Sequence, residues 1–225
     1  MKINNIKCIQ KPEIVYRYRS GKQREIDAIL NDQIWLSNPT AFDDPWDCAL
    51  SPRLEALPKE ALIEINRLRV ACFTTRNDNA RMWSHYGREH RGICIGYSTS
   101  GISLNSWDIR PVKYASKIPR NNMLSSYSDV DAHETFNNLV TIKSQDWKDQ
   151  EEWRYISWKT CGDVQEIDQD DLISITFGLR CSPRVKKTLL DTVGFYGHVR
   201  FQEVYRDPRS VQPCIRDCAA QHGKT

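Results

Sequence analysis

The chain has 225 residues, a length that suits one large domain or two small ones. Hydrophobic residues make up 40% and charged residues 27%, which excludes a collagen, a coiled coil or a wholly disordered chain. The 32 basic and 29 acidic residues leave a net charge of +3, too small to make nucleic acid the default partner. No apolar run reaches the roughly 18 residues of a membrane span, and the first residues contain no apolar signal sequence. We therefore expect neither a membrane partner nor a secretory leader.

The cysteine pattern predicts a reduced chain. Cys72 and Cys94 lie within apolar runs, where a thiol behaves as a small core side chain. The close pair Cys214 and Cys218 has no second pair, and no histidine pair, at zinc-ligand spacing. We therefore expect free cysteines, no metal and a cytoplasmic location.

In the first half of the chain, the hydrophobic pattern changes repeatedly between the periods of strands and helices. A proline at position 58 and an Asn-Asp-Asn run before position 80 mark the starts of two helices. In chain order we predict a strand over 14–19, a helix over 24–30, a strand over 33–37, a helix over 58–69, a strand over 70–75, a helix over 80–86 and a strand over 92–97.

The second half predicts, in order, a strand over 107–114, an irregular loop over 119–128, a helix over 133–147, strands over 152–158 and 172–178, a helix over 183–193 and a strand over 199–205. Ser182 is placed to cap the helix over 183–193, and the tail after Pro208 is expected to fray or to form an edge strand. Strands and helices are interspersed without regular alternation. This order predicts an α+β fold, a single domain over 1–225 with largely antiparallel sheets and flanking helices.

The chain contains no glycine-rich phosphate loop, zinc-protease helix or serine nucleophile motif. Polar residues gather instead in four aromatic-rich segments. The first is Tyr16-Arg17-Tyr18-Arg19, where strand alternation puts the arginines on one face and the tyrosines on the other. Such guanidinium groups can hold a phosphate or a carboxylate; the alternative is an edge strand with solvated arginines.

The second segment holds Asp43, Asp44 and Asp47. Three carboxylates so close together suit a divalent cation. The alternative is a structural loop in which the Asp side chains accept hydrogen bonds from nearby backbone N–H groups.

The third and fourth segments carry one candidate group each. His85 lies on an aromatic helix, where a hydrogen-bonded core histidine is the alternative to a functional one. At strand spacing, Gln150, Glu152 and Arg154 face the same way. A carboxylate in a Trp-rich strand is costly unless it is used or paired, and Arg154 or Arg19 is the alternative partner.

These segments, in this order, resemble the DUF2971 family of mainly prokaryotic proteins. The family pattern has an N-terminal YKYR strand, an NDPF[DE] loop, a central MWSHY block followed by GicigY, and a late EWR strand. The corresponding segments here are residues 16–19, 42–47, 72–74 with 82–86 and 90–97, and 147 with 150–154. The resemblance implies a unit that covers nearly the whole chain, but no activity.

A second resemblance is to ADP-ribosyltransferases of the Arg-Ser-Glu type, which carry an Arg on the first strand, a Ser/Thr-rich short strand and a late Q-x-E. Arg19, Thr74 and Gln150-x-Glu152 occur here in that order. The resemblance implies an NAD-dependent transferase or glycohydrolase that modifies a protein or nucleic acid, in a toxin or phage-defence setting.

In that hypothesis Glu152 stabilises the oxocarbenium-like ribose and Gln150 orients the acceptor. The resemblance implies three catalytic residues, Glu152, Gln150 and His85, and six that bind NAD, namely Arg17, Arg19, Tyr18, Thr74, Trp83 and Tyr86. Arg19, Thr74, His85, Tyr86 and Glu152 are expected to line one cleft. Two alternatives stay open, a metal-dependent nuclease or hydrolase that uses the Asp43–Asp47 segment, and a non-enzymatic binding or regulatory module.

Overall fold

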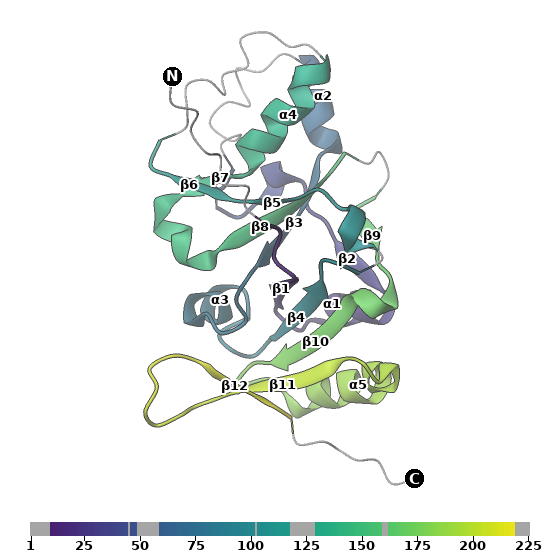
Figure 1. Cartoon of the computed structure of the whole chain (residues 1–225), viewed down its shortest axis with the longest axis vertical. Coiled ribbons are helices and arrows are strands. Elements are labelled where there is room, and N and C mark those ends of the chain that lie inside the picture. The colour runs from purple at the N-terminus through teal and green to yellow at the C-terminus, as the bar shows by residue number, and fades with distance from the viewer. Residues whose placement is uncertain are drawn as a thin grey trace.

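The computed structural model describes residues 10–44, 46–48, 59–101, 103–117, 129–158 and 162–218. An eight-stranded sheet is its centre (Figure 1). Every neighbouring pair in this sheet is antiparallel except β10 and β11, which are parallel. In spatial order the strands are β12 (Cys214–Asp217), β11 (Arg200–Tyr205), β10 (Leu172–Phe177), β4 (Ile93–Ser98), β1 (Ile14–Arg19), β3 (Arg69–Thr74), β8 (Glu152–Ser157) and β5 (Ile109–Pro111).

Two small sheets accompany the large one. In the first, β2 (Gln33–Trp35) pairs antiparallel with β9 (Val164–Glu166). In the second, β6 (Lys113–Ala115) pairs parallel with β7 (Ile142–Ser144). The structure confirms the predicted α+β class with mostly antiparallel pairing.

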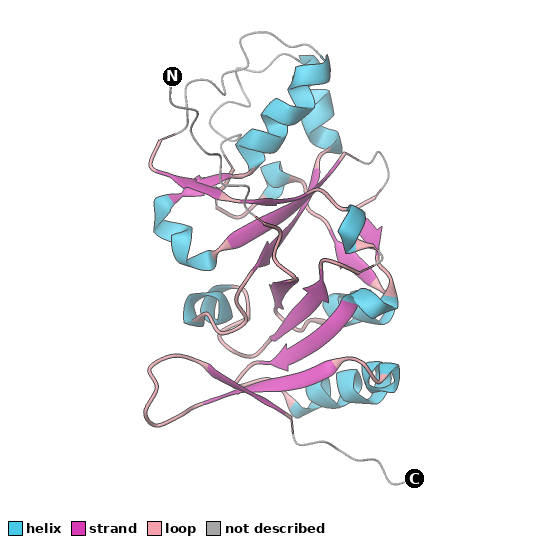
Figure 2. Ribbon diagram, viewed as in Figure 1, coloured by secondary structure: helices cyan, strands magenta, loops and turns pink. Residues whose placement is uncertain are grey.

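Helices cover both faces of the large sheet (Figure 2). The helices α1 (Gln23–Leu30) and α5 (Pro183–Val193) bury their apolar sides in one hydrophobic cluster with β1, β4, β8 and β10. We call this side the α1/α5 face. On the opposite face, α2 (Lys59–Arg67) and α4 (Asp129–Val140) pack with β3 and β8, and α3 (Ala80–His85) packs with β1, β4 and β11. This side is the α2/α3/α4 face.

Short 3-10 helices complete the described elements, namely η1 (Pro39–Ala41), η3 (Leu104–Ser106), η5 (Gln145–Gln150), η6 (Gln169–Asp171) and η7 (Gly194–Tyr196). Among the described helices, none has the length and apolar character needed to cross a membrane. The six cysteines in the described part of the chain are free, as expected.

The single strand predicted over 107–114 is wrong, because the chain changes sheets there. β5 pairs with β8 and ends at Pro111, which has no backbone N–H to continue the ladder. Val112 N then donates to Glu152 O at 2.9 Å, and Lys113 N donates to Thr141 O at 2.7 Å, which starts β6 beside β7.

The helix predicted over 133–147 is also too long. α4 ends at Val140, and the Thr141 hydroxyl donates to the carbonyl oxygens of Asn137 and Asn138 at 2.9 and 3.0 Å. These bonds satisfy carbonyls of the last helical turn, and the chain continues as β7 and η5. The tail after Pro208 forms the edge strand β12, and the loop predicted over 119–128 lies outside the described residues.

Candidate functional site

The strand register separates the predicted site residues onto two faces. Tyr16 is paired with Thr74, and Thr74 is paired with Glu152. Directly paired residues point to the same side of a sheet, so Thr74 and Glu152 share the α2/α3/α4 face with Tyr16. Arg17 and Arg19 alternate with Tyr16 and point to the α1/α5 face. The single cleft expected to join Arg19 and Glu152 is therefore not formed, because the sheet lies between them.

On the α1/α5 face, Arg17 and Arg19 line a cavity of about 130 Å³. Its walls come from β1, β4, α1 and β2, and we call it the arginine pocket. The charged residues that line it are Arg17, Arg19, Arg24 and Glu25. Three positive charges and one negative charge leave the pocket with a net charge of two positive.

Within the part of the chain that the structure describes, the arginines of this pocket have no carboxylate in an ion pair with them. Arg17 is buried, and its Nη2 donates to the carbonyl oxygen of Trp35 at 2.6 Å. The partly buried Arg19 and the exposed Arg24 make no side-chain hydrogen bond or ion pair with any described residue. Glu25 Oε2 already accepts from Ser20 Oγ at 2.7 Å and from the backbone N–H of Lys22 at 3.0 Å.

The pKa values of Arg17 and Arg19 show that burial disfavours the charged form of both guanidinium groups. Burial, followed by the charge of Arg19, lowers the pKa of Arg17 to about 9. Burial also lowers the pKa of Arg19, although Glu25 opposes the effect. Both groups stay charged near neutral pH. An anion in the pocket would supply the negative charge that the described lining residues leave unbalanced.

Tyr18 and Trp83, which were expected to bind NAD, are core residues. Their rings meet edge to face with centroids 5.0 Å apart, and Trp83 is fully buried. The Tyr18 hydroxyl donates to Arg76 O at 3.0 Å and accepts from the Asn79 N–H at 3.2 Å. The two rings pack α3 against the sheet, and because both are buried, neither is available to a ligand. This corrects both assignments.

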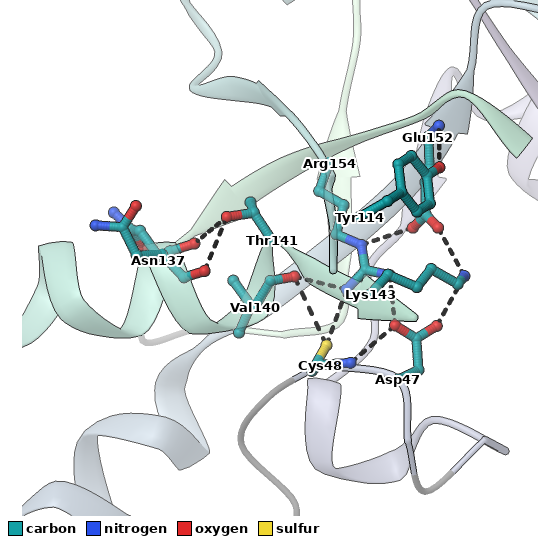
Figure 3. Close-up of polar contacts among 10 residues, drawn as sticks. Asp47, Cys48, Tyr114, Asn137, Val140, Thr141, Lys143, Glu152 and Arg154 are labelled. Atoms are coloured by element: carbon teal, nitrogen blue, oxygen red, sulfur yellow. Dashed lines mark hydrogen bonds and ion pairs between the residues drawn. The ribbon is translucent and has the colours of Figure 1, made fainter. Parts of the chain in front are cut away.

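On the α2/α3/α4 face, Asp47, Lys143, Glu152 and Arg154 form a closed network, which we call the ionic quartet (Figure 3). Glu152 Oε1 accepts from Arg154 Nε at 2.6 Å, and Glu152 Oε2 accepts from Lys143 Nζ at 2.7 Å. Asp47 Oδ1 accepts from Arg154 Nη2 at 2.6 Å, and its Oδ2 lies 3.0 Å from Lys143 Nζ. Two positive and two negative charges make the quartet neutral.

The surroundings of the quartet satisfy its remaining polar atoms. Arg154 Nη1 donates to Val140 O at 2.6 Å and to Cys48 Sγ at 2.9 Å. The backbone N–H of Glu152 donates to the Tyr114 hydroxyl at 2.8 Å (Figure 3). The network is therefore paired and hydrogen-bonded, as a buried ionic group must be to persist.

The pKa shifts make the quartet a poor acid–base catalyst. Burial raises the pKa of Glu152, but the charges of Arg154 and Lys143 outweigh burial and lower it to about 2. Burial lowers the pKa of Lys143, but Glu152 and Asp47 outweigh burial and raise it above its usual range. Both oxygens of Glu152 are occupied, and the alternative ion pair with Arg154 is the one formed. Glu152 is thus held in the quartet by two ion pairs, and the catalytic role expected for it stays a prediction.

Other predicted residues gather beside the quartet. The His85 ring meets the Trp147 ring edge to face at 5.7 Å, and Lys143 Nζ lies 5.7 Å from the same Trp147 centroid. Thr74 Oγ1 donates to Gln150 O at 2.6 Å, and the Gln150 side chain is buried. Burial raises the pKa of the nearby Tyr86, and Lys143 and the Gln150 amide oppose that effect.

The described residues also lack the arrangement of metal ligands that the metal-dependent alternative requires. Asp44 Oδ1 accepts from the backbone N–H of Trp46 at 2.9 Å, as in a structural turn. Asp47 does meet Glu152, but the Lys143 ammonium lies between their carboxylates, where a cation would bind. Within the described ranges, no group of three His, Cys, Asp or Glu side chains has metal-binding geometry.

Sequence reasoning missed Lys143 of the quartet and several residues of the arginine pocket, among them Arg24, Glu25 and Trp35. Lys143 lay in a predicted helix and so gave no sign of facing Glu152. Arg24 and Trp35 join the arginine pocket from α1 and β2. Only the packing of these elements over β1 brings them to Arg17 and Arg19, and no local pattern reports that packing.

The fold and the two sites define an α+β protein with an unneutralised arginine pocket on one sheet face and a neutral ionic network on the other. Residues 82–155 match the family model described as "Protein of unknown function (DUF2971)". The match confirms the predicted resemblance over this segment, which contributes Lys143, Glu152 and Arg154 to the quartet. No curated protein and no solved structure matches the chain.

Proposed function

We propose that the protein binds an anionic ligand, a phosphate or a carboxylate, in the arginine pocket. The observation that carries this proposal is that Arg17 and Arg19, which lie side by side on one strand face, have no ion-pair partner among the described residues. Buried charge is costly unless it is paired. The ionic quartet shows that this chain pairs other buried charges, since each of its members lies within 3.0 Å of an opposite charge.

The chemistry of the pocket suits an oxyanion. Guanidinium groups present planar, divided donors that match carboxylate and phosphate oxygens bidentately. Arg17 uses one N–H on the Trp35 carbonyl and retains others, while Arg19 and Arg24 donate none of theirs to another residue in the described ranges. The hypothesis that Arg19 holds the pyrophosphate of NAD is one version of this proposal. The transfer step of that hypothesis finds no support, because Glu152 lies across the sheet.

Calorimetric titration with inorganic phosphate, pyrophosphate and acetate tests the proposal. We expect saturable binding of at least one anion, and at least a tenfold loss of affinity in Arg19→Gln. Arg67→Gln is the matched control, because Arg67 is exposed on α2 and pairs with Glu64. Equal affinity in wild type and Arg19→Gln, or no binding of any anion, would overturn the proposal.

A further inference from the structure

We infer that the ligand of the arginine pocket is a nucleotide whose terminal phosphate monoester enters the pocket while its base stacks on Trp35 at the rim. This inference rests on the proposed function and names the ligand class. It predicts that the pocket binds a terminal phosphate in preference to the internal pyrophosphate of NAD, and a nucleotide in preference to a bare anion.

The size of the cavity selects one phosphate group. Sites that enclose a whole drug-sized ligand occupy roughly 300–1,000 Å³. The arginine pocket has about 130 Å³. It can take the end of a ligand, whereas the internal pyrophosphate of a dinucleotide carries a nucleoside on each side and would have to bring one of them in.

The charge of the pocket selects a dianion. Arg17, Arg19 and Arg24 against Glu25 give two positive charges. A phosphate monoester carries about −1.5 to −2 at pH 7, because its second pKa is about 6. A carboxylate, and each phosphate of a pyrophosphate diester, carries a single negative charge. The monoester is the group that neutralises the pocket.

The rim supplies a surface for a planar ring. Trp35 is 43% exposed and lines the same cavity. Its carbonyl is held by Arg17 Nη2, which fixes the residue next to the phosphate-binding groups. The indole makes no aromatic or cation–π contact with the described residues, and its exposed part is available to a nucleobase. Stacking of a base on an aromatic side chain is favourable for any base.

Titration with a matched ligand set tests the inference. The ligands are AMP, adenosine, ribose 5-phosphate, NAD and NADP, which adds one phosphate monoester to NAD. We expect AMP to bind at least tenfold tighter than adenosine and NAD, and NADP to bind at least tenfold tighter than NAD. AMP affinity should rise between pH 5.5 and 7.5, as the phosphate loses its second proton near pH 6.

Two variants assign the contacts. Trp35→Ala should weaken AMP about tenfold and leave ribose 5-phosphate unchanged, since only AMP carries a base to stack. Trp46→Ala is the control, because Trp46 is exposed and does not line the pocket. Arg19→Gln should weaken the binding of both AMP and ribose 5-phosphate. The unfolding transition of this variant is measured to show that it folds.

The outcomes separate this inference from the proposed function. If NAD binds as tightly as AMP and NADP, and Arg19→Gln weakens all three, the pocket binds anions but the monoester inference is wrong. If AMP and ribose 5-phosphate bind equally and Trp35→Ala changes neither, the nucleotide assignment fails. If no phosphate compound binds, the inference fails, and the proposed function fails with it when acetate does not bind either.

Discussion

At the scale of single residues, the molecule treats its buried charges in two different ways. Arg154 touches two carboxylates, a carbonyl and a thiol, so each side of its guanidinium is satisfied. Arg19 has no such partner in the described chain. Two arginines in one sheet with opposite surroundings predict opposite responses to the same substitution.

Arg19→Gln should leave stability unchanged or raise it when no anion is present, because it removes a partly buried, unpaired charge. Arg154→Gln should destabilise the protein by about 3–5 kcal/mol, because it leaves Glu152 and Asp47 short of a partner. Urea denaturation at pH 7 measures both effects. If Arg19→Gln costs as much as Arg154→Gln, then Arg19 has a structural role and the pocket is not kept for a ligand.

At the scale of elements, the sequence predicts those segments best whose local signals are complete. β1 spans residues 14–19 and α5 spans residues 183–193, as predicted. In α5 the Ser182 side chain accepts from the Val185 N–H at 3.3 Å, and Pro183 occupies the first turn. These start signals lie within a few residues of one another, so no distant contact is needed to read them.

The elements that sequence reasoning missed depend on distant partners. β9 is a three-residue strand that exists only because it pairs with β2. β7 follows α4 without a helix-breaking residue, and its pairing with β6 decides its state. The same limit applies to the sites. Alternation correctly separated Arg17 and Arg19 from Tyr18, but the relation of β1 to β8 needs the position of β3 between them.

The helix α3 offers a test of how an element is fastened. Asn79 Oδ1 accepts from the Met82 N–H at 3.1 Å as an N-cap, and its Nδ2 donates to Asp149 O at 2.6 Å. Asn79→Ala removes both bonds and should cost about 1–2 kcal/mol. Asn79→Asp keeps the cap acceptor but loses the donor to Asp149. Thermal or urea unfolding compares the two, and equal losses would show that the cap itself contributes little.

At the scale of the whole molecule, the ionic quartet joins segments that are far apart in sequence. Asp47 precedes α2, Lys143 lies in β7, and Glu152 and Arg154 lie in β8. Arg154 also holds the carbonyl of Val140 at the end of α4. The quartet therefore connects the large sheet, one small sheet and a helix. Protonation of the quartet's carboxylates should therefore change the stability of the whole molecule.

The pH dependence of stability follows from Glu152. Its folded pKa of about 2 lies below the ordinary Glu value of about 4.3, because Arg154 and Lys143 outweigh burial. A carboxyl whose pKa is lowered by folding stabilises the protein above its unfolded pKa, and this stabilisation is lost as pH falls through the folded pKa. Stability should therefore decline between about pH 5 and pH 2. Glu152→Gln should be less stable than wild type at pH 7, because Asp47 is then the only carboxylate of the quartet that pairs with Lys143 and Arg154.

Urea denaturation across this window measures the effect as a slope of unfolding free energy against pH. The slope should be smaller in Glu152→Gln than in wild type, since the titrating group is gone. Glu13→Gln is the control, because Glu13 is exposed. The two variants remove one carboxyl each, so they differ only in whether that carboxyl is held by the quartet. An acid decline as steep in Glu152→Gln as in wild type would assign the acid sensitivity to other carboxyls and leave the quartet without this role.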